Sequence, residues 1–286
     1  MDGRPGAFLQ RRYRGSAGTL DYRLYIPAGA QPMRPLVVML HGCTQSPEDF
    51  ARGTDMNRLA DELGFLVAYP GQTRTANAQK CWNWFRPDDQ QRGKGEPALI
   101  AAATQQIIDE HGCDPARVYI GGLSAGGAAA AIMGAAYPDL YAAIGIHSGL
   151  ACGAARDMPS AFGAMRGGGR PMGRADHFVP VITFHGDSDH TVNEINSRHI
   201  IAAASRSADR LDINTQKGTS LGGRRYTREA SSDAQGRVVI EQWTIHGAGH
   251  AWSGGARAGS YTDPAGPDAS REMVRFFLTH TKSSQT

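Results

Sequence analysis

Short apolar runs that alternate with helical segments constrain most strongly how this chain can fold. The runs are typical of strands buried on both faces, and an alternating segment at 20–26 predicts an edge strand before them. The runs lie at 35–40, 65–69, 118–120, 141–146, 179–184 and 237–245, with helical segments at 56–63, 97–111, 124–136 and 268–280. This order predicts an α/β fold in which a mostly parallel sheet carries helices on both faces.

Length and composition favour one globular unit. The 286 residues are 41% hydrophobic and 20% charged, so we expect a single domain over 1–286. Residues 151–174 break the strand–helix rhythm because they are rich in small residues, including three glycines at 167–169. This stretch is expected to be either a small cap or loop inserted over the sheet edge, or a surface loop without a role.

Charge and hydropathy argue against two classes of partner. The formal net charge is only +3 and the arginines are scattered, so nucleic-acid binding is not expected; Arg11, Arg12 and Arg14 fit a solvated strand edge. No apolar run reaches the roughly 18 residues of a membrane span. The first 30 residues also hold no signal-peptide core, so the protein is either cytoplasmic or shown here without an export segment.

The strongest local motif is Gly-Leu-Ser-Ala-Gly at 122–126. It lies between a predicted buried strand and an alanine-rich helix, where a nucleophilic serine occupies a sharp turn in many hydrolases. Glycines on both sides allow strand and helix to approach closely. Ser124 is therefore the predicted nucleophile, and the alternative is a glycine-rich turn that only packs.

A serine hydroxyl needs a base and an acid that orients the base. In this arrangement the acid and then the histidine follow the serine along the chain. His250, in a glycine-rich loop after the last predicted strand, is the expected base, with His246 as second choice. Asp189 is favoured as the acid over Asp187, which fits a turn cap better. The histidines that end buried strands are expected to be structural or to line the site: His41, His147 and His185.

The oxyanion of an acyl-transfer intermediate needs two N–H donors about 3 Å away. One is expected from Ala125, directly after the serine. The other is expected from Cys43, in the His-Gly-Cys loop that follows the buried strand at 35–40.

Taken together, four segments resemble the polyhydroxybutyrate-depolymerase family of esterases, with feruloyl and acetylxylan esterases as relatives. The segments lie at 40–45, 81–85, 122–127 and 249–252. The resemblance implies an α/β-hydrolase fold, a triad of Ser124, Asp189 and His250, and Cys43 at the oxyanion loop. It also implies no metal and no cofactor, and an extracellular or periplasmic location.

The resemblance further indicates the ligand and the residues near it. Nothing after the 268–280 helix encodes a separate polymer-binding domain, so soluble short-chain or hydroxyalkanoate oligoesters are the expected substrates rather than crystalline polymer. Aromatic residues near the site predict a substrate subsite, with core packing as the alternative for the tryptophans. The predicted subsite comprises His41, Trp82, Trp84 and Trp252.

Four cysteines leave the pairing open. Cys43 and Cys81 flank the same region, which suggests a disulfide between the oxyanion loop and the aromatic loop; free thiols are the alternative. Cys113 and Cys152 are expected to be unpaired.

The predicted reaction is ester hydrolysis through an acyl-enzyme, with activity falling at acid pH as the histidine base is protonated. A feruloyl or acetylxylan esterase is the alternative enzyme. A peptidase fits less well because no propeller or large cap is encoded. From another class, the chain could be a catalytically inactive binding protein on the same fold. The sequence does not define the oligomeric state.

Overall fold

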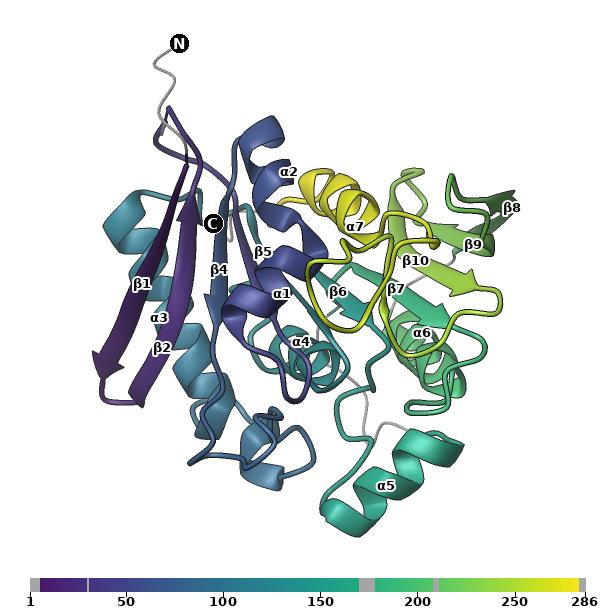
Figure 1. Cartoon of the computed structure of the whole chain (residues 1–286), viewed down its shortest axis with the longest axis horizontal. Helices are drawn as coiled ribbons and strands as arrows, with labels where there is room; N and C mark the ends of the chain where they lie inside the picture. Colours follow the sequence, from purple (N-terminus) through teal and green to yellow (C-terminus); the bar gives the residue numbers. More distant parts are fainter. Residues whose placement is uncertain (1–5, 30, 170–177, 208–210, 283–286) are drawn as a thin grey trace.

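A computed structural model describes residues 6–29, 31–169, 178–207 and 211–282, and it is built around one ten-stranded sheet (Figure 1). The strand order is β1-β2-β4-β3-β5-β6-β7-β10-β9-β8. The six strands from β4 to β10 in this order are parallel, and the two strands at each end pair antiparallel. The strands are β1 (Ala7–Gly15), β2 (Gly18–Ile26), β3 (Leu36–Leu40), β4 (Leu66–Pro70), β5 (Val118–Leu123), β6 (Ala143–His147), β7 (Val181–Gly186), β8 (Asp212–Thr219), β9 (Arg225–Ser232) and β10 (Val238–Ile245), with a separate short pair β11 (Trp252–Ser253) and β12 (Thr262–Asp263).

Helices cover both faces of the sheet, and each face has its own apolar core. Along β3, Val37 and Met39 face one core while Val38 and Leu40 face the other, as the period of two in a strand requires. The first core includes side chains of α1, α2 and α7, and the second includes side chains of α3, α4 and α6. Figure 1 shows α1, α2 and α7 in front of the sheet. The helices are α1 (Pro47–Thr54), α2 (Met56–Leu63), α3 (Gly95–His111), α4 (Ala125–Ala136), α5 (Met158–Gly167), α6 (Ile195–Ser207) and α7 (Ala269–Leu278), with a short 3-10 turn η1 (Pro87–Gln90).

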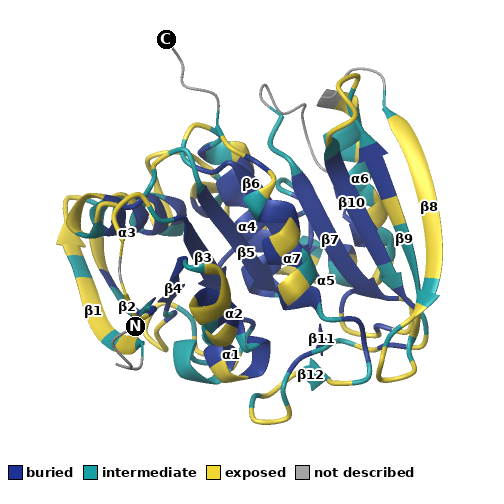
Figure 2. Cartoon of the chain, turned by 90° about the horizontal axis from the view of Figure 1, so that it is seen from above, coloured by how far each residue is buried: buried dark blue, intermediate teal, exposed yellow. Residues whose placement is uncertain are grey.

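The α/β class and the α/β-hydrolase arrangement predicted from sequence are confirmed, and the differences lie at the sheet edges. The 20–26 segment is not the edge strand, because β1 pairs outside it and carries the three arginines at 11, 12 and 14. At the other edge, β8 and β9 extend the sheet beyond β10 (Figure 2). The 151–169 part of the small-residue stretch contains helix α5, while residues 170–174 lie outside the described residues.

No helix in the described ranges is both long and apolar enough to cross a membrane.

Candidate active site

Ser124 lies on a tight turn between β5 and α4. Its backbone has φ 57° and ψ −119°, a conformation that non-glycine residues rarely adopt and that costs on the order of 1–3 kcal/mol. The neighbouring glycine is required, because a Cβ on Gly126 would lie 2.1 Å from the carbonyl oxygen of Leu40. The Ser124 N–H donates to the carbonyl of His147 at 2.9 Å, and its side chain does not cap α4. The turn therefore holds the hydroxyl at the carboxyl edge of the sheet, where it makes no capping hydrogen bond to α4.

His250 and Asp189 meet through a direct contact. The distance between His250 Nδ1 and Asp189 Oδ2 is 2.7 Å. Asp189 follows β7 and His250 follows β10, and these strands are parallel neighbours whose carboxyl ends lie together. Their loops also touch, because the Ser188 N–H donates to the Ala248 carbonyl at 3.0 Å. The ion-pair geometry fixes Nδ1 as the protonated ring nitrogen and leaves Nε2 to accept a proton.

The Asp189 carboxyl is buried but well supplied with donors. Burial on its own would raise its pKa, yet hydrogen bonds from His185 and His250 hold the pKa well below its usual range. The backbone N–H groups of Thr191 and Val192 donate to Oδ1 at 2.8 and 2.9 Å. Asp189 therefore remains ionised at any working pH and can stabilise a positive charge on His250.

The alternative pair suggested by the sequence forms a separate contact on the surface. His246 Nδ1 lies 2.8 Å from Asp187 Oδ2, and the other ring nitrogen lies 2.9 Å from the Thr227 hydroxyl. Both members of the pair are more than a third exposed. Asp187 also accepts the Gly247 N–H at 2.7 Å, so this pair fastens the loop after β7 to the end of β10.

The oxyanion loop after β3 lies directly against the serine turn. A Cβ added to Gly42 would be 3.6 Å from the Cβ of Ser124. Within the described part of the chain, the backbone N–H groups of Cys43 and Ala125 have no hydrogen-bond partner. The Ala125 N–H belongs to the first turn of α4, where N–H groups lack helical acceptors and the helix dipole favours negative charge.

His41 supports the oxyanion loop from beneath. Its Nε2 accepts the Gln72 N–H at 3.1 Å, so Nδ1 carries the proton and donates to the Gly42 carbonyl at 2.7 Å. Burial lowers the pKa of His41 to about 4. His41 is therefore neutral at neutral pH, which leaves Nε2 free to accept the Gln72 N–H while Nδ1 donates to Gly42.

The predicted substrate subsite requires a correction. His41, Trp82 and Trp252 are 0–1% exposed and Trp84 is 5% exposed, so the first three present no surface to a ligand. The Trp82 indole donates to the His41 carbonyl at 3.1 Å, and the Trp252 indole donates to the Ser270 hydroxyl at 2.9 Å. These large rings pack beneath the site because burying them contributes most when they are fully enclosed.

Cys43 and Cys81 are joined by a disulfide, the pairing suggested from their position in the sequence. The bond ties the oxyanion loop to the segment that carries Trp82. Cys113 and Cys152 are free. Burial raises the pKa of both free thiols, to about 12 and about 11, so neither is a reactive thiolate at neutral pH.

His147 lies at the site, and the sequence predicted no specific role for it or for Gln45. The His147 ring accepts the Ser253 N–H at 3.0 Å and stacks on Trp252, with ring centroids 5.0 Å apart. Because the carbonyl of His147 also holds Ser124, this residue links the serine turn to the segment that follows His250. Its position at the end of β6, the strand next to β5, was the only available signal.

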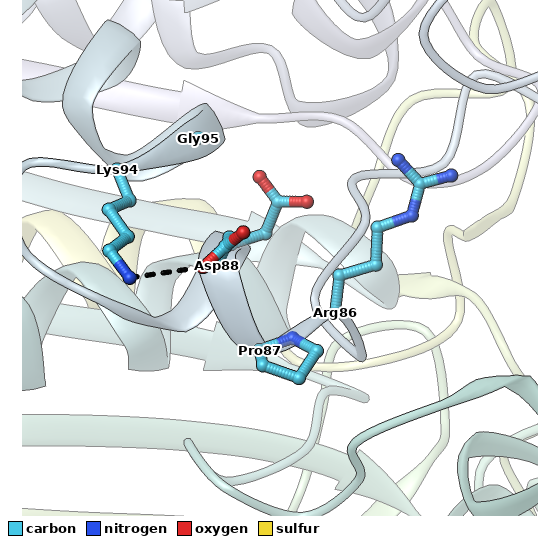
Figure 3. A pocket seen from close by; sticks show the side chains of 6 residues that line it. Arg86, Pro87, Asp88, Lys94 and Gly95 are labelled. Carbon is cyan, nitrogen blue, oxygen red and sulfur yellow. Dashed lines mark hydrogen bonds and ion pairs between the residues drawn. The ribbon is translucent and has the colours of Figure 1, made fainter.

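A separate pocket lies away from the predicted triad. It is lined by Arg86, Pro87, Asp88, Asp89, Lys94 and Gly95, around η1 and the start of α3 (Figure 3). Lys94 and Asp88 pair across it at 3.2 Å. Among the described residues, no group of three or more histidine, cysteine, aspartate or glutamate side chains could hold a metal ion.

Comparison with known proteins identifies the family. The family model described as esterase PHB depolymerase matches residues 20–228, which is most of the chain. The chain belongs to the esterase PHB depolymerase family. Poly(3-hydroxyalkanoate) depolymerase C of Paucimonas lemoignei is 32% identical over 246 residues, covering 82% of this chain and 58% of the relative. Feruloyl esterase B of Thermothelomyces thermophilus is 34% identical over 139 residues, covering 48% and 47%.

The chain thus spans about half the length of these curated members and relatives of the esterase PHB depolymerase family. Among solved structures, an acetyl xylan esterase from Aspergillus awamori superposes with a TM-score of 0.72 at 18% identity, covering 96% of this chain and 99% of the other. At that identity the likeness establishes the α/β-hydrolase fold.

Proposed function

We propose that this protein is a serine carboxylic-ester hydrolase that acts through an acyl-enzyme, with Ser124, Asp189 and His250 as its triad. The observation that carries the proposal is the 2.7 Å contact between a buried carboxylate and His250, at the same sheet edge as the strained turn of Ser124. A serine, a histidine and an orienting carboxylate in this chain order are the parts that acyl transfer on this fold requires.

In the proposed reaction, His250 Nε2 removes the proton of the Ser124 hydroxyl as the oxygen attacks the ester carbonyl. The N–H groups of Cys43 and Ala125 receive the developing oxyanion. His250 then gives its proton to the departing alcohol, which leaves an ester between Ser124 and the acyl group. A water molecule, deprotonated by the same nitrogen, then attacks the Ser124 ester. The acid is released as His250 returns the proton to the Ser124 oxygen. Throughout the cycle, Asp189 keeps the Nδ1 proton of His250 in place.

The proposed substrates are short-chain or hydroxyalkanoate oligoesters. Family membership and the 82% of the chain that aligns with a poly(3-hydroxyalkanoate) depolymerase support this class. Feruloyl or acetylated polysaccharide esters form the second candidate class, favoured by the 34% identity to a feruloyl esterase. The Cys43–Cys81 disulfide supports action in an oxidising compartment, outside the cell or in the periplasm.

A panel of substrates tests the function. Purified protein and its Ser124→Ala variant are assayed on 3-hydroxybutyrate trimer, methyl ferulate, acetylated xylan and p-nitrophenyl acetate. We expect the hydroxybutyrate oligomer to give the highest kcat/KM of the natural esters and Ser124→Ala to lose nearly all turnover. A higher kcat/KM on ferulate or acetylxylan moves the protein to the second class. If the wild type turns over none of these esters, the esterase proposal is refuted and the alternative of a catalytically inactive binding protein is favoured.

A further inference from the structure

The side chain of Gln45 lies between the oxyanion loop and the segment that follows His250. It is 3% exposed, and its Oε1 accepts the Gly42 N–H at 2.9 Å. Its own backbone N–H donates to the Gly42 carbonyl at 3.4 Å. Gln45 therefore contacts both polar groups of the glycine that precedes the proposed donor Cys43.

The carbonyl of Gly42 and the N–H of Cys43 belong to the same peptide plane. Because that plane is rigid and trans, holding the carbonyl fixes the direction in which the N–H points. The His41 ring and the backbone N–H of Gln45 both donate to this carbonyl, and both residues are buried. These donors set the direction of the Cys43 N–H, and the Gln45 side chain acts one peptide earlier by holding the Gly42 N–H.

The other end of Gln45 reaches the far segment. Its Nε2 donates to Asp49 Oδ2 at 3.1 Å and to the carbonyl and hydroxyl oxygens of Ser260, each at 3.2 Å. Asp49 in turn accepts the N–H of Ser260 at 3.1 Å, and it also accepts the Ser260 hydroxyl. Burial alone would raise the pKa of Asp49, but these hydrogen bonds lower it, so the acceptor is charged.

The segment reached by Gln45 is continuous with the proposed base. From His250 the chain passes through β11 and then lies along α1, where the Ala256 N–H donates to the Gly53 carbonyl at 2.9 Å. A Cβ on Gly259 would be 2.3 Å from the Cα of Gly53, so the two backbones are in direct contact. The Gln45 amide joins Ser260 directly to Gly42 of the oxyanion loop, and the hydroxyls of Thr44 and Tyr261, 3.2 Å apart, form a second contact between the two segments.

We propose that Gln45 is a positioning residue that aims the Cys43 N–H at the reacting oxygen and holds the base-bearing segment in register with the oxyanion loop. The inference rests on the proposed function. Gln45 acts through Gly42 and Ser260 and does not touch substrate. Its hydrogen bonds therefore matter in the transition state, when charge develops on the oxyanion, more than in the bound ester.

The decisive test exchanges the donor and the acceptor in the hydrogen bond between Gln45 and Asp49. Gln45→Glu keeps an acceptor for the Gly42 N–H but places a second carboxylate against Asp49. Adding Asp49→Asn supplies a donor between positions 45 and 49, so the double variant rebuilds that contact with its direction reversed, while the Ser260 carbonyl stays without its donor from residue 45. We expect Gln45→Glu and Gln45→Leu to lower kcat by about 10- to 100-fold with KM within about twofold, since loss of a whole oxyanion donor costs about 10²–10³. The double variant should recover part of kcat, because only the contact between residues 45 and 49 is rebuilt.

Binding of a transition-state mimic gives the readout that separates positioning from mere stability. Phenylboronic acid forms a tetrahedral adduct with a reactive serine, so its inhibition constant should rise in the Gln45 variants in parallel with the loss of kcat. Gln106→Leu, on the exposed face of α3, serves as the matched control and should leave both values unchanged. Melting temperatures are measured for every variant.

The outcomes distinguish the two proposals. If the wild type hydrolyses esters but Gln45→Leu keeps its kcat and boronate affinity, the positioning role is wrong. It is equally wrong if kcat follows melting temperature across the whole set, or if Gln45→Glu with Asp49→Asn restores the melting temperature without raising kcat above that of Gln45→Glu. A wild type with no esterase activity refutes the proposed function instead.

Discussion

Replacing Asp189 by Asn tests the proposed triad at the position where the sequence offered two candidates. The carboxylate accepts the His250 Nδ1 proton at 2.7 Å, while its other oxygen accepts two backbone N–H groups at 2.8 and 2.9 Å. An amide oxygen can keep the two backbone bonds. Its NH₂ group then faces His250 and forces the proton from Nδ1 to Nε2, the tautomer that cannot take a proton from Ser124.

The size of the effect follows from that tautomer change. Loss of the orienting carboxylate in a serine hydrolase costs about 10⁴ in kcat, which corresponds to about 5.5 kcal/mol of activation free energy. Asp187→Asn is the matched control, two residues away in the same loop. Its partner His246 is about a third exposed, and exposed pairs contribute about 0–1 kcal/mol, so kcat should change by less than about threefold.

Initial rates on p-nitrophenyl acetate, with melting temperatures alongside, measure both variants. We expect Asp189→Asn to remain folded and nearly inactive and Asp187→Asn to behave like the wild type. Equal losses of kcat in the two variants, or a kcat of Asp189→Asn within tenfold of the wild type, would show that Asp189 is not the orienting acid.

Two further predictions concern the loops that support the site. Reduction of the Cys43–Cys81 disulfide, which closes a separation of 38 residues, should lower the unfolding free energy by about 3–4 kcal/mol in chemical denaturation and lower kcat as well; Cys152→Ser is the control that should change neither. The second prediction concerns Glu96 in the first turn of α3, which accepts the N–H of Asn83 at 2.7 Å and so holds the loop that follows Cys81. Burial raises the pKa of Glu96 from 4.5 to about 7, helped by the nearby Asp89. The folded state therefore binds the Glu96 proton more tightly than the unfolded state does. As pH rises from about 4.5 to about 7, this group should reduce the unfolding free energy by about 3 kcal/mol, and Glu96→Gln should remove that slope. A variant with the wild-type pH dependence would contradict the assignment.

The buried strands were predictable because burial on both faces leaves a continuous apolar run, as at 35–40 and 179–184. Strand β8 has no such apolar run, since its residues are almost all exposed and polar. It is the last strand of the described sheet and pairs with β9. Helix α1 has the same length as α2, which was predicted, but its only large apolar side chain is Phe50, so it shows no helical repeat even though Ser46 caps it and Pro47 begins it. Local periodicity thus identifies elements whose burial is one-sided or complete, and fails where tertiary pairing supplies the stability.

The same contrast applies to the site. Chain order and strand ends predicted that Asp189 and His250 would lie together, because parallel strands deliver their following loops to one edge. The burial of Trp82 and Trp252 was not predictable, since an aromatic near a motif fits a subsite and a core equally well. Gln45 lies in the 40–45 segment that carries the resemblance, but its proposed positioning role was not predictable, because it depends on Ser260, which is 215 residues further along the chain.

Covalent labelling tests directly whether Ser124 is the nucleophile. Wild-type protein is incubated with a fluorophosphonate probe, digested, and mapped by mass spectrometry. We expect one adduct per chain, on the peptide that contains Ser124, and no adduct in the Ser124→Ala variant. An adduct on another residue, or an unlabelled wild type that still hydrolyses esters, would contradict the assignment of Ser124.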